Sequence, residues 1–394
     1  MGRIGNLVHG LKPPMLMVVV QAIFAGINLM YKLAANDGMS LRIIVAYRFM
    51  FATVVMVPLA VILERNLVYE ILNSLSSYRK SLRKINRMVL FQAFLCGLLG
   101  GSLGQNLYLQ SLVFTSATFV TAMINLAPAM TFIFAIFFKM EKLAIGTVAG
   151  KAKVLGTLIG ISGAMVFTFY KGIDINIWST NVNLLHHHQQ PGVPTGPSTH
   201  DTGKFILGAF LGLLSCISFA LWLITQAKMS IQFPYLYSTT ALMCIMGSIQ
   251  GAVFALCIER DWNQWKLGWN VRLLAVAYAG IMGSALMVFL VSWGVHLRGP
   301  LYASIFNPLG LVFVAIMGSL ILDEKLHLGS IIGGILIICG VYVVLWGKAK
   351  EMKQKTQLVP TPTADKESDH ETEEDDQKEN KERIEAVPQI TILP

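Results

Sequence analysis

The chain has 394 residues, of which 54% are hydrophobic and 13% are charged, so its apolar content exceeds what a globular core and an ordinary surface need. A water-soluble fold is thereby nearly excluded, whereas a bilayer accommodates the excess, because each membrane helix needs about 20 largely uncharged residues. The net charge of +9 comes from lysines and arginines that flank the apolar runs, which favours anionic lipid headgroups and gives no indication of nucleic-acid binding.

Apolar runs along the chain predict about ten membrane helices in an all-α fold. The first run is longer than the apolar core of a signal peptide, so we expect it to remain as a membrane helix. An even number of helices places both termini on the same side of the membrane. The helices are expected near residues 14–34, 41–63, 88–110, 117–138, 154–171, 204–226, 236–258, 272–296, 301–322 and 329–347.

The loops that follow the second and fourth of these helices are rich in basic residues. By the positive-inside bias both loops face the cytoplasm, and both termini are therefore expected to be cytoplasmic. We expect the plasma membrane as the location, with the vacuolar membrane as the alternative. The basic residues are Arg65, Arg79, Lys80, Arg83, Lys84 and Arg87 in the first loop, and Lys139, Lys142, Lys151 and Lys153 in the second.

Two segments have the composition of solvated chain. Residues 173–203 contain three prolines and the run His186 to His188, with little apolar periodicity, and are predicted to be a disordered, non-cytoplasmic linker. Residues 349–394 are predicted to be an acidic, disordered, cytosolic tail. Adjacent histidines in such a linker rarely close a coordination sphere, so neither a metal nor a cofactor is expected.

The linker separates two halves, residues 1–172 and 204–348, that resemble each other. The sequence that begins Glu-Lys-Leu at Glu141, after the fourth helix, recurs at Glu324 after the ninth, and a glycine-rich helix follows each copy. Because each half has five helices, the two repeats must run in opposite directions through the membrane. Inverted repeats are typical of transporters, in which substrate lies near the midplane and rocking of one half against the other alternates access.

Several motifs along the chain resemble one family of plant transporters. They are Tyr31-Lys32-Leu33-Ala34, Tyr47-Arg48-Phe49, Gln105-Asn106-Leu107-Tyr108, Ala122-Met123-Ile124-Asn125 with Pro128, and Phe138-Lys139-Met140-Glu141-Lys142. Over residues 12–348 this combination resembles the nodulin-21-like or walls-are-thin-related (UMAMIT) proteins, EamA-type members of the drug/metabolite transporter superfamily.

The resemblance implies ten helices in two EamA repeats, and facilitated or proton-linked movement of amino acids, with auxin as the solute of some members. The sequence departs from the family pattern at Gly104, Gln110 and Ser111, near the expected pathway. The fold therefore transfers from relatives more safely than the solute does.

Polar side chains recur at helical spacing in several expected helices, and such stripes indicate a lined cavity, because polar groups in hydrocarbon are costly. Amides supply donors and acceptors without a fixed charge, and Lys32 or Arg48 could attract a carboxylate, so the set suits a zwitterionic or carboxylated solute. The alternative for each residue is a packing role or a hydrogen bond between helices. The candidate substrate-binding residues are Gln21, Asn28, Lys32, Gln105, Asn106, Thr121, Asn125, Ser218, Trp222, Gln226, Ser304 and Asn307.

Three charged residues near helix ends are expected to face the membrane interface. Arg48 lies a turn or two inside the second helix, and we expect it to snorkel to the non-cytoplasmic interface rather than line a pathway. Glu141 and Glu324 stand where water is available and are expected to be interfacial anchors.

Together these patterns predict a membrane transporter and not an enzyme, since the helices carry no motif of paired carboxylates, metal ligands or an activated nucleophile. Amino acids are the favoured solutes, moved by alternating access or facilitated export. Auxin or another metabolite is the alternative solute, and a non-transporting scaffold or receptor is the alternative function. The expected partners are the solute and the lipid bilayer, and the sequence leaves a homo-oligomer open.

Overall fold

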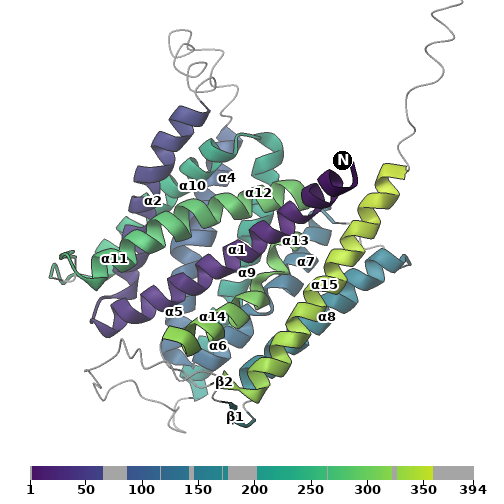
Figure 1. The fold of residues 1–394 in the computed structure, drawn as a ribbon. Coiled ribbons are helices and arrows are strands. Elements are labelled where there is room, and N and C mark those ends of the chain that lie inside the picture. The colour runs from purple at the N-terminus through teal and green to yellow at the C-terminus, as the bar shows by residue number, and fades with distance from the viewer. Residues whose placement is uncertain are drawn as a thin grey trace, which may run out of the picture. The chain divides into compact units, whose positions relative to one another are not determined.

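Figure 1 shows the protein as a computed structural model. The chain divides into two units, one of residues 1–347 and one that begins at Lys348. The described part of the first unit is almost entirely helical. The structure describes residues 2–64, 87–115, 117–141, 146–170, 172–175, 202–263, 265–321 and 326–357.

In the first half of the sequence, the third and fourth predicted helices are each divided into segments. A π-helix, η2, interrupts the third helix, and a turn at Asn125 and Leu126 divides the fourth. The elements are α1 (Gly2–Asn36), α2 (Leu41–Leu63), α4 (Arg87–Gly97), η2 (Leu98–Ser102), α5 (Leu103–Phe114), α6 (Ala117–Ile124), α7 (Ala127–Phe137) and α8 (Val148–Phe169).

The second half repeats this pattern in the same order. A π-helix, η3, interrupts the eighth predicted helix, and a turn at Ile305 and Phe306 divides the ninth. The elements are α9 (Thr202–Gln232), α10 (Leu236–Ile258), α11 (Val271–Tyr278), η3 (Ala279–Met287), α12 (Val288–Arg298), α13 (Pro300–Ser304), α14 (Asn307–Ile321) and α15 (Leu328–Gln357).

A proline explains each break. Pro128 follows Ile124, the last residue of α6, by four positions, and Pro308 follows Ser304, the last residue of α13, by the same interval. A proline ring clashes with the carbonyl group four residues earlier and donates no hydrogen bond, so each helix ends at that residue. Among the described residues nine helical stretches are long and apolar enough to span a membrane, and α7 is a shorter apolar helix. The fourth predicted helix, 117–138, is thus two shorter helices.

The two halves pack against each other in a reciprocal way. Helix α1 contacts α11, η3, α12 and α14 of the second half, whereas α9 contacts α4, α5, α6 and α7 of the first half. Helices α2 and α10, which occupy equivalent places in the two halves, pack along each other. Figure 1 shows α1 running between α11–α12 and α14. The predicted all-α fold of two five-helix repeats is confirmed.

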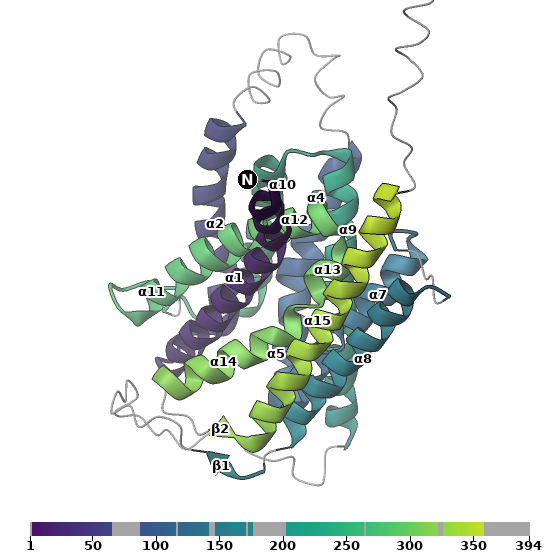
Figure 2. The ribbon, with the colours of Figure 1, turned by 45° about the vertical axis from the view of Figure 1, so that its right-hand side comes forward.

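Helix α8 and the part of α15 before Lys348 lie side by side (Figures 1 and 2). Glycines permit this approach: a Cβ atom added at Gly163 would lie 2.8 Å from the backbone nitrogen of Ile337, and one at Gly340 would lie 2.5 Å from that of Gly160. A side chain at either position would separate the helices, so Gly163 and Gly340 serve close packing.

The structure differs from the predicted unstructured segments in two places. Asp174 and Ile175, at the start of the predicted linker, form strand β1, which pairs antiparallel with β2 (Leu326–His327). The triple histidine at 186–188 lies outside the described residues. Helix α15 continues to Gln357, past the predicted start of the tail, because the lysine, glutamate and glutamine residues there are good helix formers.

Candidate substrate cavity

A cavity of about 310 Å³ lies within the bundle of the first unit, and both halves of the sequence line it. Its volume is in the range of pockets that hold small organic ligands. Most of the lining is apolar, and no described lining residue carries a carboxylate. The polar lining residues are Gln21, Asn28, Tyr31, Arg48, Gln105, Tyr108, Thr121, Asn125, Ser215 and Asn307.

The predicted site residues fall into two groups. The first group lines the cavity and consists of Gln21, Asn28, Gln105, Thr121, Asn125, Trp222 and Asn307. The second group, Asn106, Ser218, Gln226 and Ser304, lies outside the described lining. The side chain of Lys32 is outside the described part of the structure. The predicted polar residues of α1 and α6 therefore line the same cavity, together with Trp222 of α9.

The second group makes hydrogen bonds within the helical bundle. Asn106 Nδ2 donates to the carbonyl of Ser102 at 2.5 Å, and Ser218 Oγ donates to that of Leu99 at 3.0 Å. Ser304 Oγ donates to the carbonyl oxygen of Leu301 at 3.0 Å. Gln226 Nε2 donates to Ser292 Oγ. These bonds agree with the alternative interpretation of the four residues, in which they serve packing within the protein and not substrate binding.

The helix breaks bring two asparagines to the cavity. Asn125 lies in the turn between α6 and α7, and Asn307 is the first residue of α14. The side chain of Asn125 is buried, with 3% of the residue exposed, and its Nδ2 atom has no hydrogen-bond partner among the described residues. A buried amide donor without a partner is uncommon in a folded protein. Its presence in the cavity wall suits a ligand that accepts a hydrogen bond.

Trp222 is also buried against the cavity. Its indole ring lies beside Gly100 of η2, where a Cβ atom would be only 2.6 Å from Trp222 Cδ1, so the absence of a side chain there makes room for the ring. Phe219 packs on it, with ring centroids 5.4 Å apart. Both aromatic residues line the cavity and give it an apolar wall suited to an apolar or aromatic part of a solute.

Arg48 lines the cavity, and the expectation that it snorkels to the interface is wrong. Its Nε atom donates to Ser284 Oγ at 2.8 Å, and its Nη1 atom donates to the hydroxyl of Tyr31, also at 2.8 Å. The guanidinium carbon lies 4.9 Å from the centroid of the Phe49 ring. These inward contacts compete successfully with the interface, because the cavity supplies polar partners within the bundle.

Sequence reasoning missed Ser284, Tyr31 and Tyr108 as members of this region. Ser284 is fully buried in η3 and reaches Arg48 only through the packing of α2 on η3. No polar stripe marks it in the sequence. Tyr31 and Tyr108 belong to the family motifs found in the sequence, so their place in those motifs was the signal that could have located them.

Glu141 was expected to stand where water is available, at the membrane interface, but its side chain is buried in the protein. Glu141 is 8% exposed and its Oε2 atom lies 3.2 Å from Nζ of Lys153, which is 2% exposed. Lys153 belongs to α8 rather than to the loop before it. A buried carboxylate is tolerated when a cation is held against it, which explains why Glu141 is not drawn to water. Glu324 lies outside the described residues.

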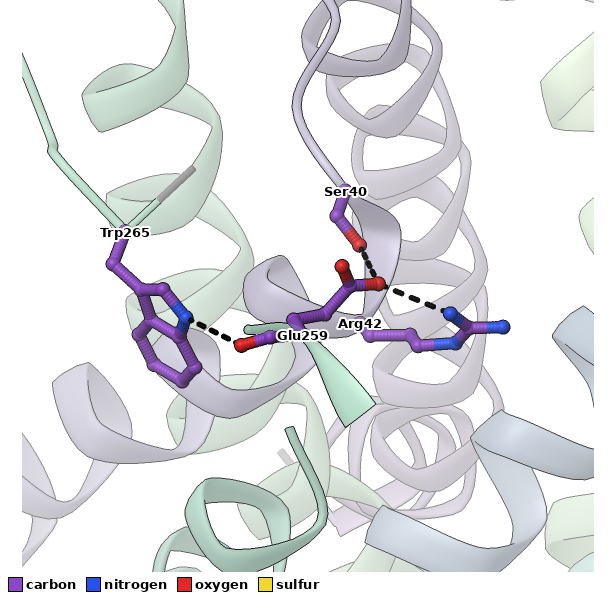
Figure 3. A network of polar contacts seen from close by, with 4 residues as sticks. All are labelled: Ser40, Arg42, Glu259 and Trp265. Atoms are coloured by element: carbon purple, nitrogen blue, oxygen red, sulfur yellow. Dashed lines mark hydrogen bonds and ion pairs between the residues drawn. The ribbon is translucent and has the colours of Figure 1, made fainter. Parts of the chain in front are cut away.

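Away from the cavity, two glutamates connect α2 and α10 at opposite ends. Glu259, after α10, accepts hydrogen bonds at Oε1 from Ser40 Oγ at 2.9 Å and from Arg42 Nη1 at 3.0 Å, at the start of α2. Its backbone carbonyl accepts a hydrogen bond from Trp265 Nε1 at 3.4 Å. Figure 3 shows this carboxylate between Ser40 and Arg42.

Glu64 makes the equivalent connection in the other direction. Its carboxylate, after α2, accepts the backbone N–H groups of Tyr237 and Ser238 at 3.0 and 2.9 Å, at the start of α10. The Ser238 hydroxyl donates to the same carboxylate. Each of these two antiparallel helices is therefore followed by a glutamate that binds the first turn of the other.

Comparison with known protein families gives one match in each half: residues 12–169 and 206–346 match the EamA-like transporter family. Together with the apolar helices of the described residues and the cavity that both halves line, these matches define a multi-pass membrane transporter. The chain belongs to the EamA-like transporter family.

Two proteins of the plant Arabidopsis thaliana are similar to most of the chain. The chain is 43% identical over 343 residues to a WAT1-related protein of Arabidopsis thaliana, covering 87% of this chain and 91% of the relative. A second WAT1-related protein of Arabidopsis thaliana is 44% identical over 337 residues, which cover 86% of this chain and 90% of the relative. The predicted resemblance to this group is confirmed.

A solved crystal structure has the same fold. It matches 87% of this chain and 98% of its own length with a TM-score of 0.59, at 14% sequence identity. At that level of identity the likeness concerns the fold alone.

Proposed function

We propose that this transporter moves amino acids, by exposing the cavity between its two halves alternately to the two sides of the membrane. The observation that carries the proposal is the lining of the cavity: amides, hydroxyls and one guanidinium group, with aromatic and aliphatic residues around them. The polar residues offer hydrogen bonds to the polar groups that amino acids share, and the apolar residues offer a surface to the side chain of the amino acid.

Alternation of access is supported by the way the fold is divided. The cavity is lined by α6 and α7, on either side of one break, and by α13 and α14, on either side of the equivalent break. Discontinuous helices at the midplane of inverted repeats are common in transporters whose halves rock around a fixed site. The reciprocal packing of α1 and α9 gives each half a helix that reaches into the other.

An aromatic carboxylate such as auxin is the second candidate solute. Trp222 and Phe219 favour it, because both rings line the cavity and could stack on an aromatic ring. A scaffold or receptor role is the remaining alternative, and it requires no flux.

We place the protein in the plasma membrane, with the vacuolar membrane as the alternative, and both termini in the cytoplasm. The basic residues of the loop after α2, between Arg65 and Arg87, support this orientation. Large exposed apolar side chains, such as Val54, Val113 and Phe137, suit contact with lipid. Self-association in the bilayer is compatible with this arrangement.

Flux through proteoliposomes tests the proposal. The purified protein is reconstituted, and the movement of a labelled panel of amino acids and of auxin is measured with and without a pH gradient, against protein-free vesicles. Saturable movement of amino acids is expected, and its dependence on the gradient distinguishes a proton-coupled carrier from a facilitator. Movement of auxin alone favours the second candidate, and no movement by folded, inserted protein supports the scaffold alternative.

A further inference from the structure

We propose that Arg48 binds the carboxylate of the transported solute, and that the cavity selects its solutes by this group more than by an amino group. The inference rests on the proposed function and makes it more specific: the shared chemistry of the solutes is a small organic monocarboxylate. Amino acids and aromatic acids such as auxin then use the same subsite.

The guanidinium of Arg48 is held in place but is not saturated. Its two hydrogen bonds, to Ser284 Oγ and the Tyr31 hydroxyl, use the Nε–H group and one N–H of Nη1. A guanidinium has five N–H groups in one plane, so a second N–H of Nη1 and both of Nη2 remain. None of these three donates to a described residue. An edge with two adjacent nitrogen atoms matches the two oxygen atoms of a carboxylate.

The charge of Arg48 is likewise not compensated within the described structure. Its two hydrogen-bond partners are neutral hydroxyls, and the described ion pairs join other residues: Arg42 with Glu259, Lys153 with Glu141, and Arg272 with Asp37. The described cavity lining contains no aspartate or glutamate. A cation in an environment of low polarity attracts a counter-ion, and here the solute can provide it.

Other groups in the same cavity also favour negative charge. The unpartnered Nδ2 of Asn125 is a hydrogen-bond donor. Helices α7 and α14 begin at Ala127 and Asn307, which both line the cavity, so their positive dipole ends lie at its wall. An ammonium group, by contrast, finds only neutral acceptors in the described lining, such as the amide oxygens of Gln21 and Asn307.

Competition with matched analogues tests the inference on the unmodified protein. Uptake of a labelled amino acid that the protein transports is inhibited with the same amino acid, its deaminated acid, its carboxamide or its decarboxylated amine. The acid is expected to inhibit within about tenfold of the parent, and the amide and amine at least about tenfold more weakly, because hydrogen bonds to charged groups are the stronger ones. An amide or amine that competes as well as the parent overturns the inference.

Substitution of Arg48 provides the second test. Arg48→Gln is expected to weaken the apparent affinity for the carboxylate solute by about 10- to 100-fold and to remove the discrimination against the amide. Arg48→Lys keeps the charge without the forked geometry, so it should retain the preference for acids at reduced affinity. The matched control is Arg260→Gln, which removes an exposed arginine outside the cavity and should leave affinity and selectivity unchanged.

The outcomes separate the inference from the proposed function. If Arg48→Gln transports the parent solute with unchanged affinity and selectivity, the inference is wrong and amino acid transport stands. If the wild-type protein transports no carboxylate, both are wrong. If Arg48→Gln does not fold, the analogue competition on wild-type protein still decides the matter.

Discussion

Asn125 is the clearest single residue on which to test the cavity. Its side chain lines the cavity from the turn between α6 and α7, and its buried Nδ2 atom has no described partner. Replacing Asn125 by leucine removes a donor that the folded protein leaves unused, so stability should change little. Flux should fall by about tenfold or more if that donor binds the solute, since a hydrogen bond to a charged group is worth one to two powers of ten.

The measurement for Asn125→Leu is the initial rate of uptake, normalised to the amount of folded protein, together with the unfolding temperature. Gln110→Leu is a suitable comparison, because it also replaces an amide by leucine, but Gln110 lies outside the described cavity lining. An unchanged rate in Asn125→Leu would remove this residue from the site.

At the level of single residues, the sequence located many polar lining groups, but for Arg48 it favoured the membrane interface over the cavity. Gln21, Asn28, Thr121 and Asn125 were found because polar groups in apolar helices are costly and point toward protein or water. Arg48 was misplaced because a long side chain near a helix end can reach either the interface or the interior. Its partner Ser284 comes from a segment far along the chain, and no local pattern brings the two together.

Among the elements, α2 and α10 are joined at both ends by Glu64 and Glu259. Glu64 accepts backbone N–H groups of the first turn of α10, whereas Glu259 accepts the side chains of Ser40 and Arg42 at the start of α2. The dipole at a helix N-terminus favours a negative charge at both places. Glu64→Gln and Glu259→Gln should therefore each lower the free energy of unfolding by about 0.5–2 kcal/mol. Because the two sites lie at opposite ends of long helices, their effects should add.

Thermal unfolding of the purified variants, followed by tryptophan fluorescence, measures this effect. Asp261→Asn serves as the control, since Asp261 is an exposed acidic residue in the loop after α10. Unfolding temperatures that equal the wild-type value in both glutamate variants would show that these contacts do not stabilise the pair.

The sequence predicted element boundaries best where local signals set them. The bounds 41–63 and 236–258 match α2 and α10, which are single uninterrupted apolar runs. The breaks at Asn125 and Ile305 were not predicted as helix ends, although Pro128 and Pro308 were visible, because a proline in a membrane helix also occurs in kinked but continuous helices. The π-helices η2 and η3 have no sequence signature of their own and depend on packing.

At the scale of the whole molecule, the inverted repeat was predicted because helix counts and a recurring motif survive in the sequence. The order in which the helices pack was not predicted, because lipid and the protein interior are equally apolar. The periodicity of apolar residues therefore does not show which helix faces contact protein and which contact lipid. The structure supplies that order: α1 packs against helices of the second half, and α9 packs against helices of the first half. The cavity lies where these two helices meet the broken helices.

The central claim is that one cavity carries the solute and faces the two sides in turn. Counterflow tests it most directly: proteoliposomes are loaded with unlabelled amino acid, and uptake of the labelled form is followed from a dilute outside solution. A carrier with a single alternating site should accumulate label transiently above the level reached in unloaded vesicles. Equal uptake in loaded and unloaded vesicles, by folded and inserted protein, would contradict the account.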